Sequence, residues 1–394
     1  MEKKKIILSL LAVMPLATTG LHAQDDKTSQ FNPVEHAVIS QTIAPDARAA
    51  GMGDVGAATD PDVNSQAWNL AKYPFCISRA GVALNYTPWL RQLVNDIDLA
   101  YLAGYYRIGD YSALSGSLRY FSLGEVYTSE SSDVTVKPYE MSLDVAYSRM
   151  LSETFSLGVG LRWIYSDLRY DYSEDSKPAS AYAADIAMYY NNYLMLGNRE
   201  CQLGLGLVVS NIGSKISYYG DEESQFIPAN LRLGTSLMIP VDEFNRFSIS
   251  ADANKLLVPT VPQQEVYADG SVEDRSSYQD RVRREYSDMS SISGIFKSFS
   301  DAPGGFKEEL EEIQWSVGAE YTYNEQFSIR AGYHHESESK GNRKYFTVGG
   351  GFRMNVFSLD VGYVISTAQS NPLDQTLRFT LAFDMDGIKD LFRR

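Results

Sequence analysis

The sequence contains few of the residues from which metal sites and hydrolytic active sites are built. Its 394 residues include 2 cysteines and 4 histidines, and the G-x-S-x-G motif of serine hydrolases is absent. No group of cysteine, histidine and carboxylate side chains has the spacing of metal ligands. His334 and His335 are adjacent and would point to opposite faces of a strand, so we expect an ordinary exposed pair. We therefore expect a protein that is not an enzyme and that has no metal and no cofactor.

Long hydrophobic runs and an excess of positive charge are also missing. Beyond the first residues, no apolar run approaches the roughly 18 residues that a membrane-spanning helix needs. The mean hydropathy of −0.26 would suit a soluble protein, but membrane β-barrels have similar values because half of each strand is polar. The net charge of −15 argues against nucleic acid as a partner.

The first 23 residues have the pattern of a secretory signal peptide. Lys3, Lys4 and Lys5 precede an apolar run at residues 6–16, and the small Ala23 stands where cleavage would follow. We predict that residues 1–23 are removed and that Gln24 begins the mature chain.

Apolar and polar residues alternate strictly in short segments over most of the remaining chain. Residues 139–148 and 155–165 are the clearest examples, and the second has one exception, the apolar Ile164 at a polar position. A period of two predicts strands with one apolar and one polar face. The same pattern recurs at residues 313–323, 327–333, 357–365 and 377–383. We count about fourteen such segments, an even number, which predicts an all-β fold: a transmembrane antiparallel β-barrel spanning residues 80–384.

The connections between these segments are alternately short and long. The short ones are residues 107–111, 149–154, 241–246, 324–326 and 353–356, and the long ones are 124–138, 167–180, 213–228, 336–344 and 367–375. Outer-membrane barrels have short periplasmic turns and long extracellular loops, whereas a soluble β-sandwich has no reason to sort its loops in this way. The alternation also predicts a periplasmic tail at residues 385–394.

The two cysteines fall on segments that a fourteen-stranded barrel would place on opposite sides of its wall. Cys76 precedes the first strand and Cys201 opens the seventh. A disulfide requires Cα atoms within roughly 7 Å of each other, so we expect two free, buried thiols.

The longest connection, residues 258–312, is predicted to be extracellular. Its first half, around Asp274, has the composition of a solvated or mobile loop. Its second half has two amphipathic helical patterns, separated by a Pro-Gly-Gly sequence at 303–305. These short helices either cover the barrel mouth as a lid or offer a docking surface to another protein. The candidate docking residues are Ile292, Ile295, Phe296, Phe299, Phe306 and Leu310.

Residues 24–79 contain no clear strand and are rich in small residues. Gly51, Gly53 and Gly56 satisfy G-x-G-x-x-G, but the strand and helix of a dinucleotide-binding unit are not present around them. We interpret this periplasmic segment as a hatch inside the barrel lumen, where small residues let the backbone approach the wall closely. The candidate hatch residues are Gly51, Gly53, Gly56, Asp60 and Asn69.

Strand alternation also assigns a set of charged residues to the lumen. They are Arg119, Glu140, Asp144, Arg162, Arg232, Glu320, Arg330, Arg353, Asp360 and Arg378. Because an unpaired buried charge is costly, we expect an ion-pair network that holds the N-terminal segment. A selective pore for a charged solute is the alternative.

Three segments carry a family resemblance. They are AGMGDVGAATDPD at residues 50–62, AWNLAKYP at 67–74 and SDAPGGFKEEL at 300–310. With the signal peptide and about fourteen strands, the chain resembles the PorV (LptO) family of the type IX secretion system of Bacteroidetes, within the wider group of FadL-like barrels. FadL-like hatches typically contain Asn-Pro-Ala, whereas this chain has Asn69, Leu70 and Ala71.

The resemblance implies an integral protein of the bacterial outer membrane, embedded in the lipid bilayer and without catalytic activity. Its implied partners are an SprA/Sov-like translocon, the C-terminal sorting domains of secreted cargo, and an attachment complex with a PorU-type sortase. The protein would carry cargo from translocon to attachment complex.

Two other functions remain open. A FadL-like channel for hydrophobic small molecules would need an apolar pocket, but the predicted lumen is charged and glycine-rich. A lipopolysaccharide deacylase would need a nucleophile and a base that the sequence does not supply.

Overall fold

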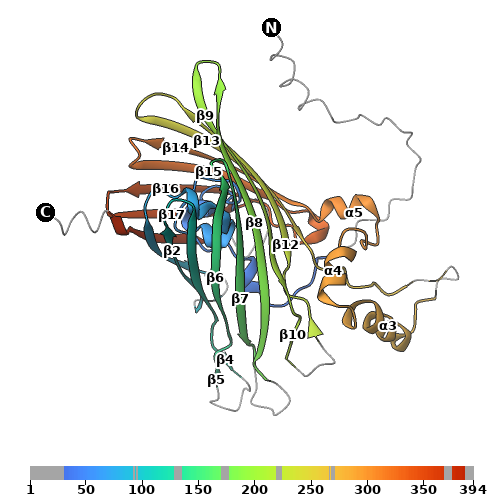
Figure 1. Ribbon diagram of the computed structural model, residues 1–394. Coiled ribbons are helices and arrows are strands. Elements are labelled where there is room, and N and C mark those ends of the chain that lie inside the picture. Colours follow the sequence, from blue (N-terminus) through green and yellow to red (C-terminus); the bar gives the residue numbers. More distant parts are fainter. Residues whose placement is uncertain are drawn as a thin grey trace, which may run out of the picture. The chain divides into compact units, whose positions relative to one another are not determined.

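The computed structural model describes residues 31–91, 94, 96–127, 135–169, 177–218, 224–265, 267, 271–367 and 375–386. Within these ranges, fourteen antiparallel strands close into a barrel (Figure 1). The predicted all-β barrel is therefore confirmed. The predicted signal peptide at 1–23 and most of the predicted tail, residues 387–394, lie outside the described residues.

The barrel strands follow each other around the wall in chain order, and β1 closes the sheet by pairing with β18. They are β1 Ala80–Pro88, β2 Ile97–Ile108, β3 Ser112–Leu123, β6 Tyr139–Ser152, β7 Phe155–Asp167, β8 Ala179–Leu196, β9 Arg199–Gly213, β12 Asn230–Pro240, β13 Asn245–Leu256, β14 Gln314–Tyr323, β15 Phe327–His335, β16 Tyr345–Arg353, β17 Phe357–Ser366 and β18 Leu377–Asp384. Two small hairpins lie in connecting loops: β4 Val126–Tyr127 with β5 Thr135–Val136, and β10 Ile216–Ser217 with β11 Ser224–Gln225.

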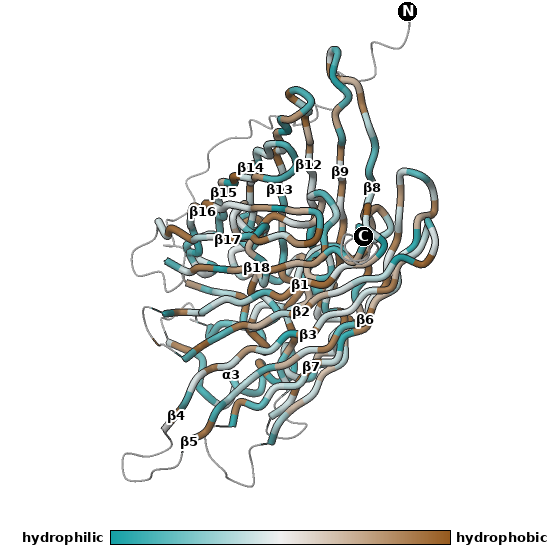
Figure 2. Tube along the Cα trace, turned by 90° about the vertical axis from the view of Figure 1, so that its left-hand side faces the viewer, coloured by the Kyte–Doolittle hydropathy of each residue, from teal (hydrophilic) through white to brown (hydrophobic). Residues whose placement is uncertain are grey.

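The wall has an apolar outer face and a polar inner face because side chains alternate along each strand. In β1, Leu84 and Tyr86 point outward and are exposed, while Asn85 and Thr87 point inward and are buried. Figure 2 shows the resulting alternation of hydrophobic and hydrophilic residues along the strands. No helix in the described part of the chain is both long and apolar enough to cross a bilayer.

The barrel has a short-turn end and a long-loop end. The turn between β14 and β15, for example, occupies residues 324–326, whereas the connection between β13 and β14 occupies 257–313. Figure 1 shows the helices of that long connection gathered at the long-loop end.

The lumen is occupied by the N-terminal segment at residues 31–79, which we call the hatch. It contains two 3-10 turns, η1 Ile39–Thr42 and η2 Leu70–Phe75, and two single-turn helices, α1 Ala47–Ala50 and α2 Ser65–Trp68, drawn in blue inside the strands in Figure 1. The hatch packs so closely on the wall that side chains are excluded at several wall positions. A Cβ atom added at Gly206 would lie 2.1 Å from the carbonyl oxygen of Ala57, and hatch atoms similarly approach Gly158, Gly204, Gly234, Gly318, Gly332, Gly349 and Gly362.

The long connection contains more helix than the sequence suggests. Besides α4 Ser291–Lys297 and α5 Phe306–Glu311, it has α3 Arg275–Val282, which continues as the π-helical turn η4 Arg283–Ser287. The prediction of a loop around Asp274 was thus wrong for the residues that follow it. Asp274 accepts hydrogen bonds from the N–H groups of Ser276 and Ser277 and so caps α3, whose side chains have no apolar stripe to reveal it.

Two other expectations concern single residue types. Cys76 and Cys201 are both free and buried, as predicted.

The expectation of an exposed histidine pair was wrong, because His334 faces the lumen, where it stacks on Tyr345. His335 faces outward and stacks on Trp315.

Candidate functional site

The hatch glycines at positions 51 and 53 are buried against the wall. Gly53 has a φ of 72°, and its N–H donates to Thr347 Oγ1 at 2.8 Å. A Cβ atom there would lie 2.7 Å from the carbonyl oxygen of Tyr333, so both the backbone angle and the close approach require glycine. Gly51 faces Gly349 of β16, and a Cβ on Gly51 would lie 3.0 Å from its Cα.

The third hatch glycine is held by a wall carboxylate. The N–H groups of Gly56 and Ala57 both donate to Asp252 Oδ2, at 2.8 Å and 2.9 Å. Asp252 lies on β13 and is buried. A Cβ atom on Gly56 would lie 2.3 Å from the ring of Trp68. One inward-facing side chain therefore fixes this turn of the hatch by accepting two backbone hydrogen bonds.

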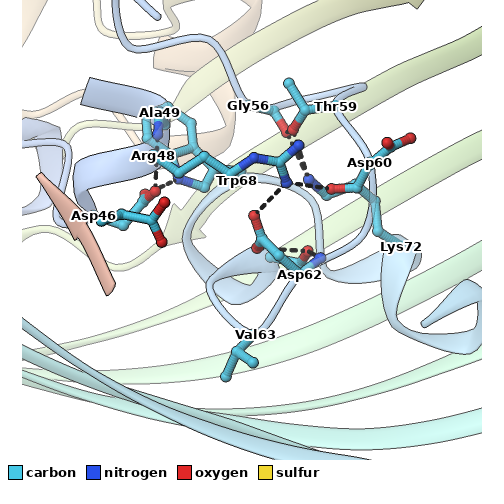
Figure 3. Close-up of polar contacts among 12 residues, drawn as sticks. Asp46, Arg48, Ala49, Gly56, Thr59, Asp60, Asp62, Val63, Trp68 and Lys72 are labelled. Atoms are coloured by element: carbon cyan, nitrogen blue, oxygen red, sulfur yellow. Dashed lines mark hydrogen bonds and ion pairs between the residues drawn. The ribbon is translucent and has the colours of Figure 1, made fainter. Parts of the chain in front are cut away.

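Asn69 joins the hatch to β8, while Asp60 acts through its backbone. The Asn69 side chain donates to the carbonyl oxygen of Met188 at 2.9 Å and accepts from the N–H of Ala71 at 3.0 Å. The turn after Asn69, which has Leu70 and not proline at the next position, is thus held by hydrogen bonds. The carbonyl oxygen of Asp60 accepts from Arg48 Nη1 at 3.0 Å (Figure 3).

A chain of alternating charges runs from the hatch into the wall. Arg48 of α1 makes two contacts with Glu320 of β14, at 3.0 Å and 3.2 Å, and pairs with Asp62 at 2.9 Å (Figure 3 shows the hatch side). Arg330 of β15 pairs with Glu320 at 2.5 Å and with Asp360 of β17 at 2.7 Å. These five side chains have low exposure, so their charges compensate each other away from bulk water.

A second group of charges lies within the wall itself. Arg162 of β7 pairs with Asp144 of β6 and, at 2.9 Å, with Asp185 of β8. Asp144 also accepts from Ser117 Oγ at 2.6 Å, and Asp185 accepts from the N–H of Asn211 at 2.8 Å. This group links strands β3, β6, β7, β8 and β9 across the inner face.

Arg119 and Glu140 bind the backbone at the start of the hatch. Arg119 Nη1 donates to the carbonyl oxygens of Ser40 and Ile43, at 2.6 Å and 2.8 Å. Glu140 accepts from the N–H of Ser40 at 2.9 Å. Both wall charges therefore hold η1 in place.

The other three arginines predicted to face the lumen differ in whether they form an ion pair. Arg378 of β18 pairs with Asp54 of the hatch at 2.5 Å. Arg232 and Arg353 form no ion pair with another described residue: the guanidinium of Arg232 lies 4.5 Å from the centroid of Trp68, and Arg353 is exposed at the short-turn end. The set of ten thus contains eight residues that bind a charge or the hatch backbone in the lumen.

The sequence-based set lacks several charged residues of the lumen, among them Asp185, Asp252, Arg48 and Asp54. Asp185 and Asp252 occupy inward positions of β8 and β13, so the alternation could have identified them. Arg48 and Asp54 lie in the hatch, where no periodicity shows which way a side chain points.

The space left inside the barrel is polar. A cavity of about 110 Å³ next to the hatch is lined by charged side chains, among them Arg119, Asp144, Arg162, Asp185 and Arg232. A second cavity of about 390 Å³ opens at the short-turn end and includes the chain of charges around Glu320. No group of three or more His, Cys, Asp or Glu in the described ranges is arranged to hold a metal ion. These spaces suit water and polar groups better than an apolar ligand.

The candidate docking residues divide between α4 and α5. On and just after α4, Ile292, Phe296 and Phe299 are exposed, with 73 % of Phe296 accessible, while Ile295 is half-buried. The opposite side of α4 is anchored by Gly294, where a Cβ atom would lie 2.6 Å from the ring of Phe226. On α5, Phe306 and Leu310 are exposed.

The segment between α4 and α5 contains a carboxyl group with an altered pKa. Burial raises the pKa of Asp301 to about 6, and the acidic Glu309 and Glu312 add to the increase. A hydrogen bond from the N–H of Thr260 opposes it. The segment is therefore held more tightly when Asp301 is protonated.

Several solved structures are similar to this chain at low sequence identity. The Ralstonia pickettii toluene transporter TbuX has 12 % sequence identity and a TM-score of 0.49, over 88 % of this chain and 99 % of that one. The Pseudomonas putida toluene transporter TodX has 10 % identity and a TM-score of 0.49, over 90 % and 99 %. A Pseudomonas aeruginosa FadL homologue has 11 % identity and a TM-score of 0.43, over 86 % and 98 %. No curated protein matches the sequence.

A family comparison gives a specific result. The model of the family described as type IX secretion system protein PorV matches residues 26–264, which include the hatch and the wall from β1 to β13. This match covers more than half of the chain. It contains two of the three segments that carry the resemblance, 50–62 and 67–74, whereas the segment 300–310 lies outside it. The chain therefore belongs to the PorV family of type IX secretion system proteins.

Proposed function

We propose that this protein is a non-enzymatic carrier of the type IX secretion system in the outer membrane. It binds the C-terminal sorting domain of cargo released by an SprA/Sov-like translocon and passes the cargo to an attachment complex with a PorU-type sortase. Residues 1–23 are removed on export, and the long-loop end faces the cell exterior. Family membership supports the secretion role, and the sorting of long and short connections supports the orientation.

The observation that carries this proposal is the apolar surface of α4. We call Ile292, Phe296 and Phe299 the α4 surface. Large apolar side chains that stay exposed on an ordered helix are typical of protein interaction sites, and aromatic residues often dominate the binding energy there. A β-rich sorting domain could bury these side chains without any rearrangement of the barrel.

The occupied lumen supports carriage outside the barrel rather than passage through it. The hatch is tied to the wall by Arg48, Asp54, Gly56 and Asn69, and side chains are excluded where it touches the wall glycines. A channel for hydrophobic small molecules would need an apolar path, but the cavity beside the hatch is charged. The channel is therefore the weaker candidate.

The proposal is tested by deleting the gene and restoring it with variants. Deletion should leave cargo with C-terminal sorting domains unprocessed inside the cell envelope. The wild-type gene should restore surface attachment, and a gene with Phe296→Asp and Phe299→Asp should not. The matched control is Phe244→Asp, since Phe244 is similarly exposed but lies in a turn at the short-turn end.

Two outcomes would contradict the proposal. Normal surface attachment in the deletion strain, with loss of uptake of long-chain lipids, would favour the channel. Full restoration by the variant of the α4 surface would show that cargo transfer does not use this surface. The amount of folded barrel in the membrane must be equal for all variants.

A further inference from the structure

The helix α5 places its charged side chains against the barrel and its apolar side chains toward the surroundings. Lys340 Nζ contacts Glu308 at 2.6 Å and Glu312 at 3.0 Å. Lys255 Nζ contacts Glu309 at 3.0 Å and Glu312 at 2.5 Å. Both lysines are buried at the barrel rim. The acidic side of α5 therefore holds the helix against the barrel rim, and the apolar side of α5 stays exposed.

The outer side of α5 combines apolar groups with one cation. Phe306 is 78 % exposed and Leu310 is 52 % exposed. Lys307 lies between them in sequence, is exposed, and has no ion pair with another residue of the described ranges. Apolar side chains next to a free cation are the pattern by which short helical segments bind an anionic membrane surface.

This outer side is continuous with the outer face of the barrel wall. Leu310 and Lys307 line a shallow hollow of about 460 Å³ together with Glu311, Ile313, Trp315, His335 and Ser337. The Glu311 carboxylate accepts a hydrogen bond from Ser339 Oγ at 2.6 Å. Trp315 is the first outward-pointing residue of β14, and its side chain is exposed. Figure 1 shows α5 at the long-loop end, next to the ends of β14 and β15.

The wall beside the hollow has the aromatic residues of a membrane interface. The ring of Trp315 lies 5.5 Å from that of Tyr333, which lies 4.9 Å from that of Phe346. Aromatic rings at strand ends of membrane barrels mark the depth of the lipid headgroups. Because Leu310 shares a hollow with Trp315, α5 lies at this same depth.

We propose that α5 binds the outer leaflet of the membrane, with Phe306 and Leu310 among the acyl chains and Lys307 beside a lipid phosphate. The helix would thus act as an interfacial anchor that holds the long connection flat on the membrane next to β14. This assigns Phe306 and Leu310 to lipid and leaves the α4 surface for protein. The inference does not depend on what the α4 surface binds.

The test measures the depth of spin labels in reconstituted vesicles. Cys76 and Cys201 are first replaced by alanine, and single cysteines are introduced by Phe306→Cys or Leu310→Cys. Val317→Cys on the outer wall serves as the lipid reference, and Phe296→Cys on α4 serves as the aqueous reference. The vesicles contain phosphatidylcholine and lipid A.

We expect labels at 306 and 310 to resemble the label at 317. Their accessibility to oxygen, relative to a water-soluble nickel chelate, should exceed that of the label at 296 several-fold. Equal accessibility to the nickel chelate at 306 and 296 would overturn the inference. If the labels at 306 and 310 become protected from the nickel chelate only after a cargo sorting domain is added, α5 binds protein instead of lipid. Spin–spin broadening between labels on different molecules would show that α5 binds a second copy of this chain.

The role of the cation has a separate test. In the variant labelled at 310, Lys307→Glu should make the label shallower in vesicles that contain the anionic lipid A. The change should be much smaller in phosphatidylcholine alone, because its choline groups offset its phosphates. An equal depth with and without Lys307→Glu in both kinds of vesicle would overturn the assignment of Lys307 to a lipid phosphate.

Discussion

Substitution of a single wall glycine should loosen the hatch without damaging the barrel. Gly332 of β15 faces the lumen, and a Cβ atom there would lie 2.1 Å from the carbonyl carbon of Met52 and 2.3 Å from the amide nitrogen of Gly53. Both obstacles are backbone atoms, so Gly332→Ala can be accommodated only if the hatch moves away from the wall. The adjacent strand offers a control, Gly350, which faces outward and where the nearest heavy atom to a Cβ is 3.9 Å away.

The size of the effect follows from the cost of overpacking. Forcing an extra methyl group into a packed interior costs about 1–3 kcal/mol. The change in strand propensity from glycine to alanine is common to both variants and cancels in the comparison. If this cost destabilises the packed hatch relative to a hatch detached from the wall, the population of detached hatch rises about 5- to 150-fold. This follows because about 1.4 kcal/mol corresponds to a factor of ten.

Hydrogen exchange on the hatch amides measures this population directly. In Gly332→Ala the amides of residues 51–57 should exchange faster by the factor above, while the amides of the barrel strands keep their protection. In Gly350→Ala the hatch should exchange as in the wild type. Equal hatch exchange in the two variants would refute the conclusion that the hatch packs directly against β15.

Two further predictions concern charged residues. Glu320→Gln leaves Arg48 and Arg330 without their shared carboxylate, so the free energy of unfolding in detergent should fall by about 3–5 kcal/mol. The control Glu325→Gln, at an exposed residue, should change the free energy of unfolding by less than about 1 kcal/mol. Equal losses of unfolding free energy in the two variants would contradict a stabilising ion-pair network around Glu320. Because the pKa of Asp301 is raised from 3.8 to about 6, its contribution to the stability of the loop between α4 and α5 should be complete below pH 3.8 and be lost as the pH rises through 6. Hydrogen exchange of the loop, corrected for intrinsic rates, should show this trend; Asp301→Asn should flatten it, and an unchanged pH profile in that variant would contradict the assignment.

The barrel could be predicted from the sequence because each wall residue contacts either the outer apolar surroundings or the polar lumen. The alternating segment at 139–148 lies within β6, which continues to Ser152, and the segment at 155–165 becomes β7 with two more residues. The exception at Ile164 also has a physical reason. Its side chain points inward but is fully buried in an apolar cluster with Val38 of the hatch and Ile216. The inner face of the wall is therefore apolar where this cluster packs.

The partners of the luminal charges could not be predicted in the same way. Strand alternation shows that Glu320 points inward, but its partner Arg48 is 272 residues away in a segment without periodicity. Arg378 and Asp54 are 324 residues apart. Such pairs depend on how the hatch folds inside the closed barrel, which no local pattern records. The division of the docking residues between α4 and α5 likewise depends on the contacts of the buried lysines at the rim.

Binding of a purified cargo sorting domain to the reconstituted protein tests the central claim most directly. The wild type and Phe244→Asp should bind with equal affinity, and the Phe296→Asp and Phe299→Asp variant should bind about tenfold or more weakly, as expected when aromatic residues at the centre of an interface are lost. Unchanged affinity in that variant, with the barrel folded, would contradict the claim that the α4 surface receives cargo.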